Sequence, residues 1–411
     1  MRVVHLSKND IGGGAARAAY RLHIEMLRAG INSKMFVLNK EKLGDENIDS
    51  ITTISKRVFS ILRDIVNVSF SSFVNKSKWT FSFDVLGVNV SKYLSVRTAD
   101  IIYVHWVNGG FMTLRNLEQL LRLNKQVVFV LHDMWVLTGG CHHSFECTQY
   151  FEDSCRVCPL MESNSRKYFP LSFYKKKADI FTKYKNYQIV TPSKWLGECA
   201  RKVPYFSKTK ISVIPNPLDY NIFKPFSKKG ARSILNIDID TKLILFVADL
   251  GTENPYKGWK FLEEALLKLS AESQYKIQVM VLGCDRNLEL EKLLPYKIHF
   301  AGRLFDEYSL SLVYNAADVF VTPSLADNLP STILESISCG TPVVGFRVGG
   351  IPDMIKHQEN GYLANYKSVD DLVEGIIFSF ENLQNVSLDP YFDTDRIINS
   401  YQQLTSDIEK L

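Results

Sequence analysis

The sequence lacks the patterns that define several classes of protein. No window approaches the ~18 uninterrupted apolar residues of a membrane-spanning helix. The segment MRVVHLSKND passes from a strand pattern directly into a polar loop, without the apolar stretch and cleavage site of a secretion signal. A net charge of +5 is too small for a protein that coats nucleic acid, although it suits anionic ligands or an anionic membrane surface. We therefore expect a cytoplasmic protein without a nucleic-acid partner.

Cysteine is scarce, but its distribution is uneven. Four of the seven cysteines fall in the segment CHHSFECTQYFEDSCRVC, residues 141–158. In a reducing compartment, clustered thiols are more often metal ligands than disulfides. Four thiolates leave no position for a catalytic water, so the expected metal is a structural zinc. The predicted ligands are Cys141, Cys147, Cys155 and Cys158, with His142 and His143 as alternatives. Packed thiols without a metal are the competing interpretation.

Short apolar runs alternate with amphipathic patterns through both halves of the chain. The first half contains RVVHLS, SKMFVLN, DIIYVHW, QVVFVLH and YQIVTPS, and the second half TKLILFVAD, KIQVMVLG, KIHFAG, DVFVTPS and TPVVGF. This alternation is typical of α/β proteins with parallel sheets covered by helices on both faces. A chain of 411 residues exceeds one ordinary core, which favours two domains.

A proline-rich connector, ISVIPNPLDYNIFKP, separates the two halves. We therefore predict two facing Rossmann-like domains, residues 1–215 and 216–385, with a cleft between them. A last helix within residues 386–411 is expected to pack back on the N-terminal domain. Ligands of such sheets bind beyond the carboxyl ends of the strands, at helix N-termini.

The segment 56–78 interrupts this rhythm with apolar residues at roughly helical spacing and basic residues around them. The apolar positions are Val58, Ile61, Leu62, Ile65, Val68 and Phe73. The favoured interpretation is a helix that packs its apolar face on its own domain. The alternative is an interfacial helix that contacts an anionic membrane.

Two loops of the first half could contact a ligand. Gly12, Gly13 and Gly14 stand between the first strand and an alanine-rich helix, where the backbone can approach an anion closely. The GxGxxG fingerprint is absent, which argues against a nicotinamide cofactor. His132 and Asp133 follow the buried strand QVVFVL, where an imidazole could bind a substrate hydroxyl and a carboxylate could orient that imidazole. A turn and a structurally satisfied histidine are the competing interpretations.

In the second half, Lys257 precedes a helix and Arg303 follows a strand, so both could bind a diphosphate. The stretch PSLADNLPSTILESISCGTPVV places Asp327 in a loop before a helix that is expected to begin near Ser331. The N–H groups of Ser331 and Thr332 could hold a phosphate, Asp327 a sugar and Glu335 a ribose. Solvated surface charges and an ordinary helix cap are the competing interpretations.

These motifs resemble one enzyme family. Asp327 and Glu335 have the D/E-x7-E spacing of retaining glycosyltransferases of family 4, and AGRLFDEYSLSLVYNAADVFVTPS with LESISCGTPVV is similar to their nucleotide-sugar domain. IGGGAARAA and IPNPLD are similar to the family's glycine loop and hinge, and HDMWVLTGGCHH resembles a bacterial subgroup that assembles surface polysaccharides (colanic acid, O-antigen or capsule). The resemblance covers nearly the whole chain and implies the GT-B fold.

The resemblance also implies roles for individual residues. It implies an N-terminal domain that binds the acceptor and a C-terminal domain that binds a UDP- or GDP-sugar. The implied catalytic residues are His132, Lys257, Arg303 and Asp327. The implied donor-binding residues are Gly13, Gly14, Lys257, Arg303, Asp327, Asn328, Leu329, Ser331, Thr332 and Glu335. No cofactor is expected for catalysis, and the acceptor is a glycan, in one version lipid-linked, reached at the inner face of the plasma membrane.

Two departures from the family pattern affect this expectation. Many members have glutamate where Asp327 stands, and many carry an arginine shortly before the lysine, near the position of Asp249. Two other functions compete with the transferase: a sugar-nucleotide epimerase of the GT-B fold and a non-catalytic binding module that carries zinc.

Overall fold

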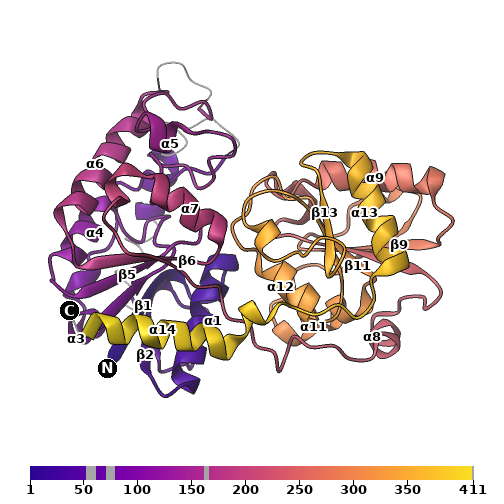
Figure 1. Ribbon diagram of the computed structural model, residues 1–411, viewed down its shortest axis with the longest axis horizontal. Coiled ribbons are helices and arrows are strands. Elements are labelled where there is room, and N and C mark those ends of the chain that lie inside the picture. The colour runs from indigo at the N-terminus through magenta and orange to yellow at the C-terminus, as the bar shows by residue number, and fades with distance from the viewer. Residues whose placement is uncertain (52–61, 71–78, 162–165, 410–411) are drawn as a thin grey trace. The chain divides into compact units, whose positions relative to one another are not determined.

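The computed structural model describes residues 1–51, 62–70, 79–161 and 166–409, which form two compact units (Figure 1). Unit 1 consists of Met1–Pro217 and Thr394–Leu411, and unit 2 of Leu218–Asp393. Each unit contains one parallel sheet. None of the described helices is long and apolar enough to cross a membrane.

The sheet of unit 1 has seven strands in the order β3-β2-β1-β4-β5-β6-β7, and every neighbouring pair is parallel. The strands are β1 (Arg2–Asn9), β2 (Asn32–Asn39), β3 (Ile48–Ser50), β4 (Ile101–Val104), β5 (Gln126–Val130), β6 (Tyr187–Thr191) and β7 (Ile211–Val213). The central strands are apolar on both sides because helices cover both faces of the sheet.

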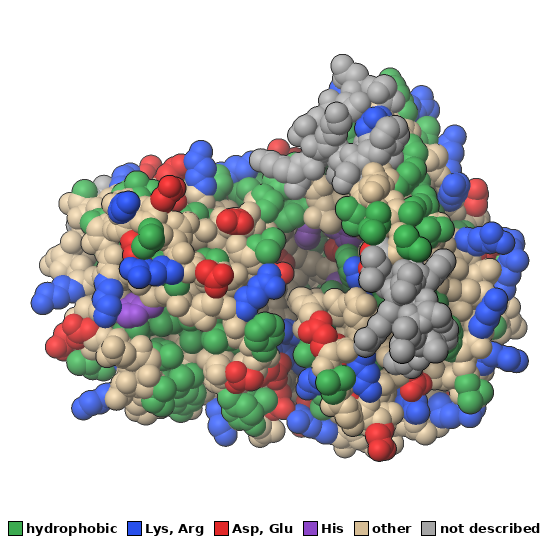
Figure 2. Space-filling model, turned by 180° about the vertical axis from the view of Figure 1, so that it is seen from behind, with side chains coloured by type: hydrophobic (Ala, Val, Ile, Leu, Met, Phe, Trp, Pro, Cys, Tyr) green, Lys and Arg blue, Asp and Glu red, His purple; other side chains and the backbone are tan. Residues whose placement is uncertain are grey.

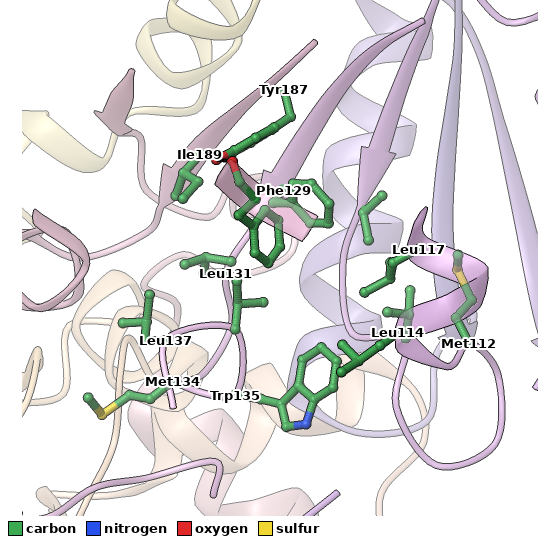
Figure 3. Packing of buried hydrophobic residues seen from close by; sticks show 14 of the residues in the cluster. Met112, Leu114, Leu117, Phe129, Leu131, Met134, Trp135, Leu137, Tyr187 and Ile189 are labelled. Atoms are coloured by element: carbon green, nitrogen blue, oxygen red, sulfur yellow. Dashed lines mark hydrogen bonds between the residues drawn. The ribbon is translucent and has the colours of Figure 1, made fainter. Parts of the chain in front are cut away.

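Two layers of helices enclose this sheet. The helices of unit 1 are α1 (Gly14–Arg28), α3 (Leu94–Thr98), α4 (Leu114–Leu121), α5 (Gln149–Glu152), α6 (Phe169–Lys183), α7 (Lys194–Lys202) and α14 (Thr394–Glu409), with short 3-10 turns at Val90–Lys92 and Pro204–Phe206. Leu22 of α1 and Tyr401 of α14 pack with Val3 and Val128 on one face. Side chains of α4, α6 and α7 pack on the other face, where Phe129 of β5 contacts Phe181 of α6. Leu117 of α4 belongs to the same cluster as Phe129 (Figure 3).

Unit 2 repeats the scheme with six parallel strands in the order β10-β9-β8-β11-β12-β13. The strands are β8 (Lys242–Val247), β9 (Ile277–Leu282), β10 (Lys297–Phe300), β11 (Val319–Thr322), β12 (Val343–Phe346) and β13 (Gly361–Ala364). The helices are α8 (Lys228–Leu235), α9 (Trp259–Glu272), α10 (Leu288–Leu293), α11 (Glu307–Ala316), α12 (Ser331–Ser338) and α13 (Val369–Asn382), with 3-10 turns at Gly251–Glu253, Ile351–Asp353 and Pro390–Phe392. Side chains of α8, α11 and α12 cover one face of the sheet, and those of α9 and α13 cover the other.

The helical segment 62–70 exposes most of its apolar side chains, and only Phe70 at its end packs against the core, beside Phe169. Leu62, Ile65, Val66 and Val68 are exposed by 41–65%, whereas Arg63 and Asn67 are buried. Asn67 is held in place because its amide bonds the main chain of residues 85 and 86. The expectation that this face packs on its own domain is therefore wrong for the described turn, because hydrogen-bonding polar side chains occupy the inner side. The other expected apolar positions, Val58, Ile61 and Phe73, lie outside the described residues.

Candidate functional site

Each sheet has a switch point, where the chain leaves neighbouring strands in opposite directions. In unit 2 it lies between β8 and β11, and in unit 1 between β1 and β4. The loops that follow these strands diverge there and leave a crevice in which α/β proteins bind ligands. The predicted site residues of both units lie in loops or helix ends at the carboxyl edge of these sheets.

At the switch point of unit 2, Lys257 and Asp327 form an ion pair. Lys257 stands between β8 and α9, Asp327 stands between β11 and α12, and Nζ lies 2.5 Å from Oδ2. The other carboxylate oxygen of Asp327 accepts a hydrogen bond from the main-chain N–H of Asn328 at 3.1 Å. Both side chains remain partly exposed. The structure thus brings together two residues that were predicted to bind phosphate and sugar.

Close backbone contacts hold these two loops against each other. The N–H of Leu325 donates to the carbonyl of Tyr256 at 2.7 Å. Gly258 has φ +63°, and a Cβ there would lie 2.0 Å from the carbonyl oxygen of Pro323. Gly349 has φ +58°, and its Cβ would lie 2.0 Å from the carbonyl oxygen of Asp327. Only glycine fits at these two positions, which fixes the loops that carry the ion pair.

The helix α12 begins at Ser331, as predicted, and its N-terminus has no side-chain cap. Pro330 is the cap residue and offers no hydroxyl or carboxylate to the first-turn N–H groups of Ser331 and Thr332. Such a helix end attracts an anion. Of the other predicted donor residues, Asn328 and Leu329 are buried beside this helix start.

Glu335, one turn into α12, is almost completely buried. Its Oε2 accepts a hydrogen bond from the Tyr314 hydroxyl at 3.0 Å, and its exposure is 3%. Sequence reasoning missed Tyr314, because its partnership with Glu335 depends on the packing of α11 against α12.

Arg303 follows β10 and forms an ion pair with Asp249, at 2.8 Å between Nη2 and Oδ1. Both side chains are at least half exposed, so the pair contributes little to stability and an anion can replace Asp249. Arg303 thus stands at the end of a strand, as predicted. Its partner Asp249 was noted in the sequence only as a departure from the family pattern.

In unit 1 the glycine loop leads directly into α1. Gly13 has φ +90° and stands at the cap position, and Gly14 is the first residue of the helix. A Cβ added at Gly13 or Gly14 would meet no heavy atom within 4 Å. The loop therefore presents backbone rather than side chains at the carboxyl end of β1.

His132 lies just beyond β5 and belongs to a row of histidines. Its Nε2 lies 3.0 Å from Nδ1 of His105, which follows β4, and Nε2 of His105 lies 3.0 Å from Nδ1 of His5 in β1. Burial lowers the pKa of His132 to about 4, although the negative charge of Asp133 opposes this shift. Sequence reasoning missed His5 and His105. The only available signal was that each lies in or next to an apolar strand.

Asp133 was expected to orient His132, but its carboxylate has other partners. Oδ2 accepts from Nδ1 of His142 at 2.5 Å and from the Trp106 indole at 2.9 Å, and Oδ1 accepts from the Trp135 N–H at 2.8 Å. Burial alone would raise the pKa of Asp133, but His142 and these hydrogen bonds lower it to about 2. The ring that bonds Nε2 of His132 is His105. His142, bonded also to Ser82, is occupied in this network rather than turned toward the cysteines.

The four clustered cysteines line one small cavity together with Phe81, Tyr150 and Leu160. Burial raises the pKa of every one of these thiols: Cys141, Cys147, Cys155 and Cys158. Within the described ranges, no group of three or more His, Cys, Asp or Glu side chains is arranged to hold a metal ion. The sulfurs share a cavity without forming a ligand set, so zinc binding stays a prediction.

The sequence and the fold are similar to known glycosyltransferases. Residues 241–382 match the family described as "Glycosyl transferases group 1". An uncharacterized glycosyltransferase of Methanocaldococcus jannaschii is 26% identical over 71% of this chain and 75% of its own length. The Escherichia coli UDP-Gal:alpha-D-GlcNAc-diphosphoundecaprenol alpha-1,3-galactosyltransferase is 27% identical over 44% of this chain and 48% of its own length. The chain thus spans about half the length of that relative.

The solved structure of Anabaena HepE in complex with UDP and glucose matches the fold with a TM-score of 0.64 and 14% identity, over 99% of both chains. The predicted fold class, two Rossmann-like domains of the GT-B type, is confirmed by this likeness and by the two parallel sheets.

The buried histidines predict a specific loss of stability in acid. Burial lowers the pKa of His5 and His105 well below the usual value and that of His23 and His132 to about 4. The unfolded chain binds protons at these rings below about pH 6.5, whereas the folded chain does not. The free energy of unfolding should therefore fall as the pH falls from about 6.5 toward 4, by at most about 1.4 kcal/mol per pH unit for each ring.

Urea unfolding at pH 7.0 to 4.5 measures this slope. His5→Phe should make the slope shallower than that of the wild type. An equal slope in wild type and His5→Phe would contradict the assignment of a lowered pKa to His5.

Proposed function

We propose that this protein is a retaining glycosyltransferase that moves a sugar from a nucleoside diphosphate to a glycan hydroxyl without a catalytic metal. The observation that carries the proposal is the Lys257–Asp327 pair beside the uncapped N-terminus of α12, at the switch point of unit 2. These groups lie within residues 241–382, the part of the chain that matches the glycosyltransferase family. The GT-B fold and a solved neighbour that binds UDP and glucose support the same assignment.

We assign the donor to these groups as follows. The diphosphate binds Lys257 and the N–H groups of Ser331 and Thr332, and it draws Lys257 away from Asp327. Asp327 then accepts hydrogen bonds from the hydroxyls of the sugar, and Glu335 binds the ribose. Arg303 supplies a second cation when an anion replaces Asp249 at its guanidinium. UDP- and GDP-sugars both fit this assignment.

The reaction breaks the bond between the anomeric carbon and the β-phosphate oxygen, and the electron pair stays with the diphosphate. The acceptor oxygen forms the new bond to the anomeric carbon, and its proton passes to the leaving phosphate. Because negative charge grows on the diphosphate, Lys257 and the α12 N-terminus stabilise the transition state more than the ground state. Attack on the face that the phosphate leaves retains the anomeric configuration.

Unit 1 supplies the acceptor side in this proposal, with His132 as the histidine near the reacting sugar. The acceptor is a glycan of bacterial surface polysaccharide biosynthesis, linked to a lipid at the cytoplasmic face of the membrane. Two features support a lipid-linked acceptor: the exposed apolar turn 62–70 and the diphosphoundecaprenol substrate in the name of the E. coli relative.

Donor binding and transfer test the proposal directly. UDP- or GDP-sugars should raise the unfolding temperature, because a ligand that binds only the folded state stabilises it. Lys257→Met should lower the transfer rate by about 100-fold, the scale of losing one charge-stabilising group. The matched control is Lys260→Met, in the first turn of α9 and 82% exposed, which should keep the wild-type rate.

The competing functions give other results in the same assays. Isomerisation of the donor without an acceptor would identify an epimerase. No shift with any sugar nucleotide, together with an unaffected Glu335→Ala variant, would identify a binding module. A product of inverted anomeric configuration, detected by NMR, would overturn retention.

The proposed membrane contact predicts that the exposed apolar side chains of the helical segment 62–70 bind lipid. Leu62→Gln/Ile65→Gln/Val68→Gln should reduce co-sedimentation with vesicles that contain phosphatidylglycerol. The control replaces three exposed aliphatic side chains elsewhere in unit 1, Leu43, Leu94 and Val157, by Gln. Equal lipid binding by both triple variants would dismiss the contact.

We also propose that the cysteine cavity takes a structural zinc. Main-chain N–H groups already donate to three of its sulfurs: Gly139 to Cys155, Gln149 to Cys147, and Leu160 and Met161 to Cys158. Such bonds favour thiolates over thiols. Burial lowers the pKa of the Lys177 ammonium to about 7, whereas Cys155 and Cys141 act in the opposite direction and raise it. A zinc ion with four thiolate ligands carries a net negative charge, opposite to that of the Lys177 ammonium.

Elemental analysis of the purified chain decides the zinc proposal. We expect about one zinc per chain, and Cys158→Ser should lower both the zinc content and the unfolding temperature. Cys339→Ser, a buried thiol in unit 2, is the control and should keep the zinc. A content below about a tenth of an equivalent would end the proposal.

A further inference from the structure

Three imidazole rings stand in single file across the centre of the unit 1 sheet. His5, His105 and His132 come from β1 and from the ends of β4 and β5, which are neighbours in the sheet. The two ring-to-ring hydrogen bonds are both 3.0 Å long, and in both pairs the ring centroids lie 5.3 Å apart with the ring planes tilted by only 25–26°, as in rings that meet edge to edge. The same two atoms, Nδ1 of one ring and Nε2 of the next, meet at each step.

The inner end of this file is closed. His5 is fully buried and stacks on Tyr103 at 4.9 Å, and its Nε2 has no hydrogen-bond partner. The next ring, His23 on α1, meets His5 edge-on at 5.8 Å, but its own Nδ1 bonds the Ser33 hydroxyl at 2.7 Å. His23 therefore lies beside the file without continuing its hydrogen bonds.

A neutral imidazole carries one donor and one acceptor nitrogen, so the whole file has only two arrangements of protons. In one, all three rings carry the proton on Nδ1, and each donates toward His132. In the other, all three carry it on Nε2, and each donates toward His5. The rings are neutral because burial lowers the pKa of His5 and His105 well below the usual value and that of His132 to about 4.

The closed end selects between the two arrangements. Protons on Nε2 would leave an N–H of His5 in the core without an acceptor, whereas protons on Nδ1 leave only an unused lone pair there. Among buried main-chain groups, an N–H without an acceptor is rarer than an incompletely used acceptor. The environment of His5 thus sets the tautomer of His132, two rings away.

We propose that His5 and His105 are positioning residues that hold His132 in its Nδ1–H tautomer, as a hydrogen-bond donor at the carboxyl end of β5. A donor nitrogen suits a sugar hydroxyl or a ring oxygen, and it is unsuited to act as a general base. This assignment of the role of His132 in transfer rests on the proposed function. The tautomer itself does not.

Nitrogen-15 NMR of histidine-labelled protein tests the tautomer without any substrate. At pH 7 the long-range proton–nitrogen pattern should show all three rings neutral with the proton on Nδ1. Signals of the Nε2–H tautomer, or of an imidazolium, at His132 would overturn the proposal. The result holds whether or not the protein transfers sugar, so it separates this proposal from the proposed function.

Two substitutions of His105 sharpen the test. His105→Phe keeps a flat ring and removes both bonds, so His132 should become a mixture of tautomers. His105→Asn places an amide nitrogen near the former Nδ1 and should keep His132 in the Nδ1–H form. His357→Gln, an exposed histidine of unit 2, is the control and should leave His132 unchanged.

Kinetics then measure the consequence for transfer. His105→Phe should lower kcat by about tenfold with little change in the donor KM. This is the low end of the loss known for residues that orient a metal-bound histidine through a hydrogen bond. His105→Asn should restore most of the wild-type kcat. If His105→Phe does not fold, the wild-type spectrum and His105→Asn still decide the tautomer. A pure Nδ1–H form of His132 in folded His105→Phe would show that His105 does not set it.

Discussion

The parallel pairing of every strand in both sheets is the constraint on which the candidate site depends. Parallel strands end at one edge, and the chain must cross back through a helix before each new strand. Every polar loop that follows a strand therefore opens at the same edge. At the switch points two such loops diverge, and there the protein places Lys257 with Asp327 in unit 2 and His105, which follows β4 and bonds His5 inside β1, in unit 1. The apolar strands form the core of each unit, and the polar loops at the carboxyl edge carry the residues of the candidate site.

The elements were predictable where one physical signal dominated. Apolar runs bounded by turns predicted the central strands, and the alanine-rich stretch after Gly13 predicted α1, because alanine has the highest helix propensity. The start of α12 at Ser331 followed from Pro330, which suits the N-terminus of a helix and not its interior. The segment 56–78 misled because spacing alone does not say which face is inside. Its described turn buries Arg63 and Asn67, whose polar groups find hydrogen bonds, and exposes the aliphatic face.

The partners of the candidate site residues were much harder to predict. His5 and His105 are 100 positions apart, and only the register that sets His5 opposite Tyr103 brings their rings together. Strand order is not written in local sequence, so no spacing rule could have found this file. The same holds for Tyr314 on Glu335, which depends on the contact between α11 and α12. Individual residues at strand ends were visible in the sequence, but their pairings required the tertiary structure.

The charges at the edge of unit 2 decide what can hold a diphosphate. Lys257 and Arg303 are each paired with a carboxylate, Asp327 and Asp249 respectively, so the four side chains bring no net positive charge. An anion that enters must displace carboxylates or bind groups that are not neutralised. The first-turn N–H groups of α12 are such groups, because no side chain caps them and their partial charge cannot be titrated away. The pair at Arg303 is exposed and yields easily, whereas Asp327 is held by the N–H of Asn328 and by the glycines around its loop. In the proposed function, a diphosphate at this edge would therefore depend first on backbone dipoles, and the two cations would add to them only after their carboxylates move or turn to the sugar.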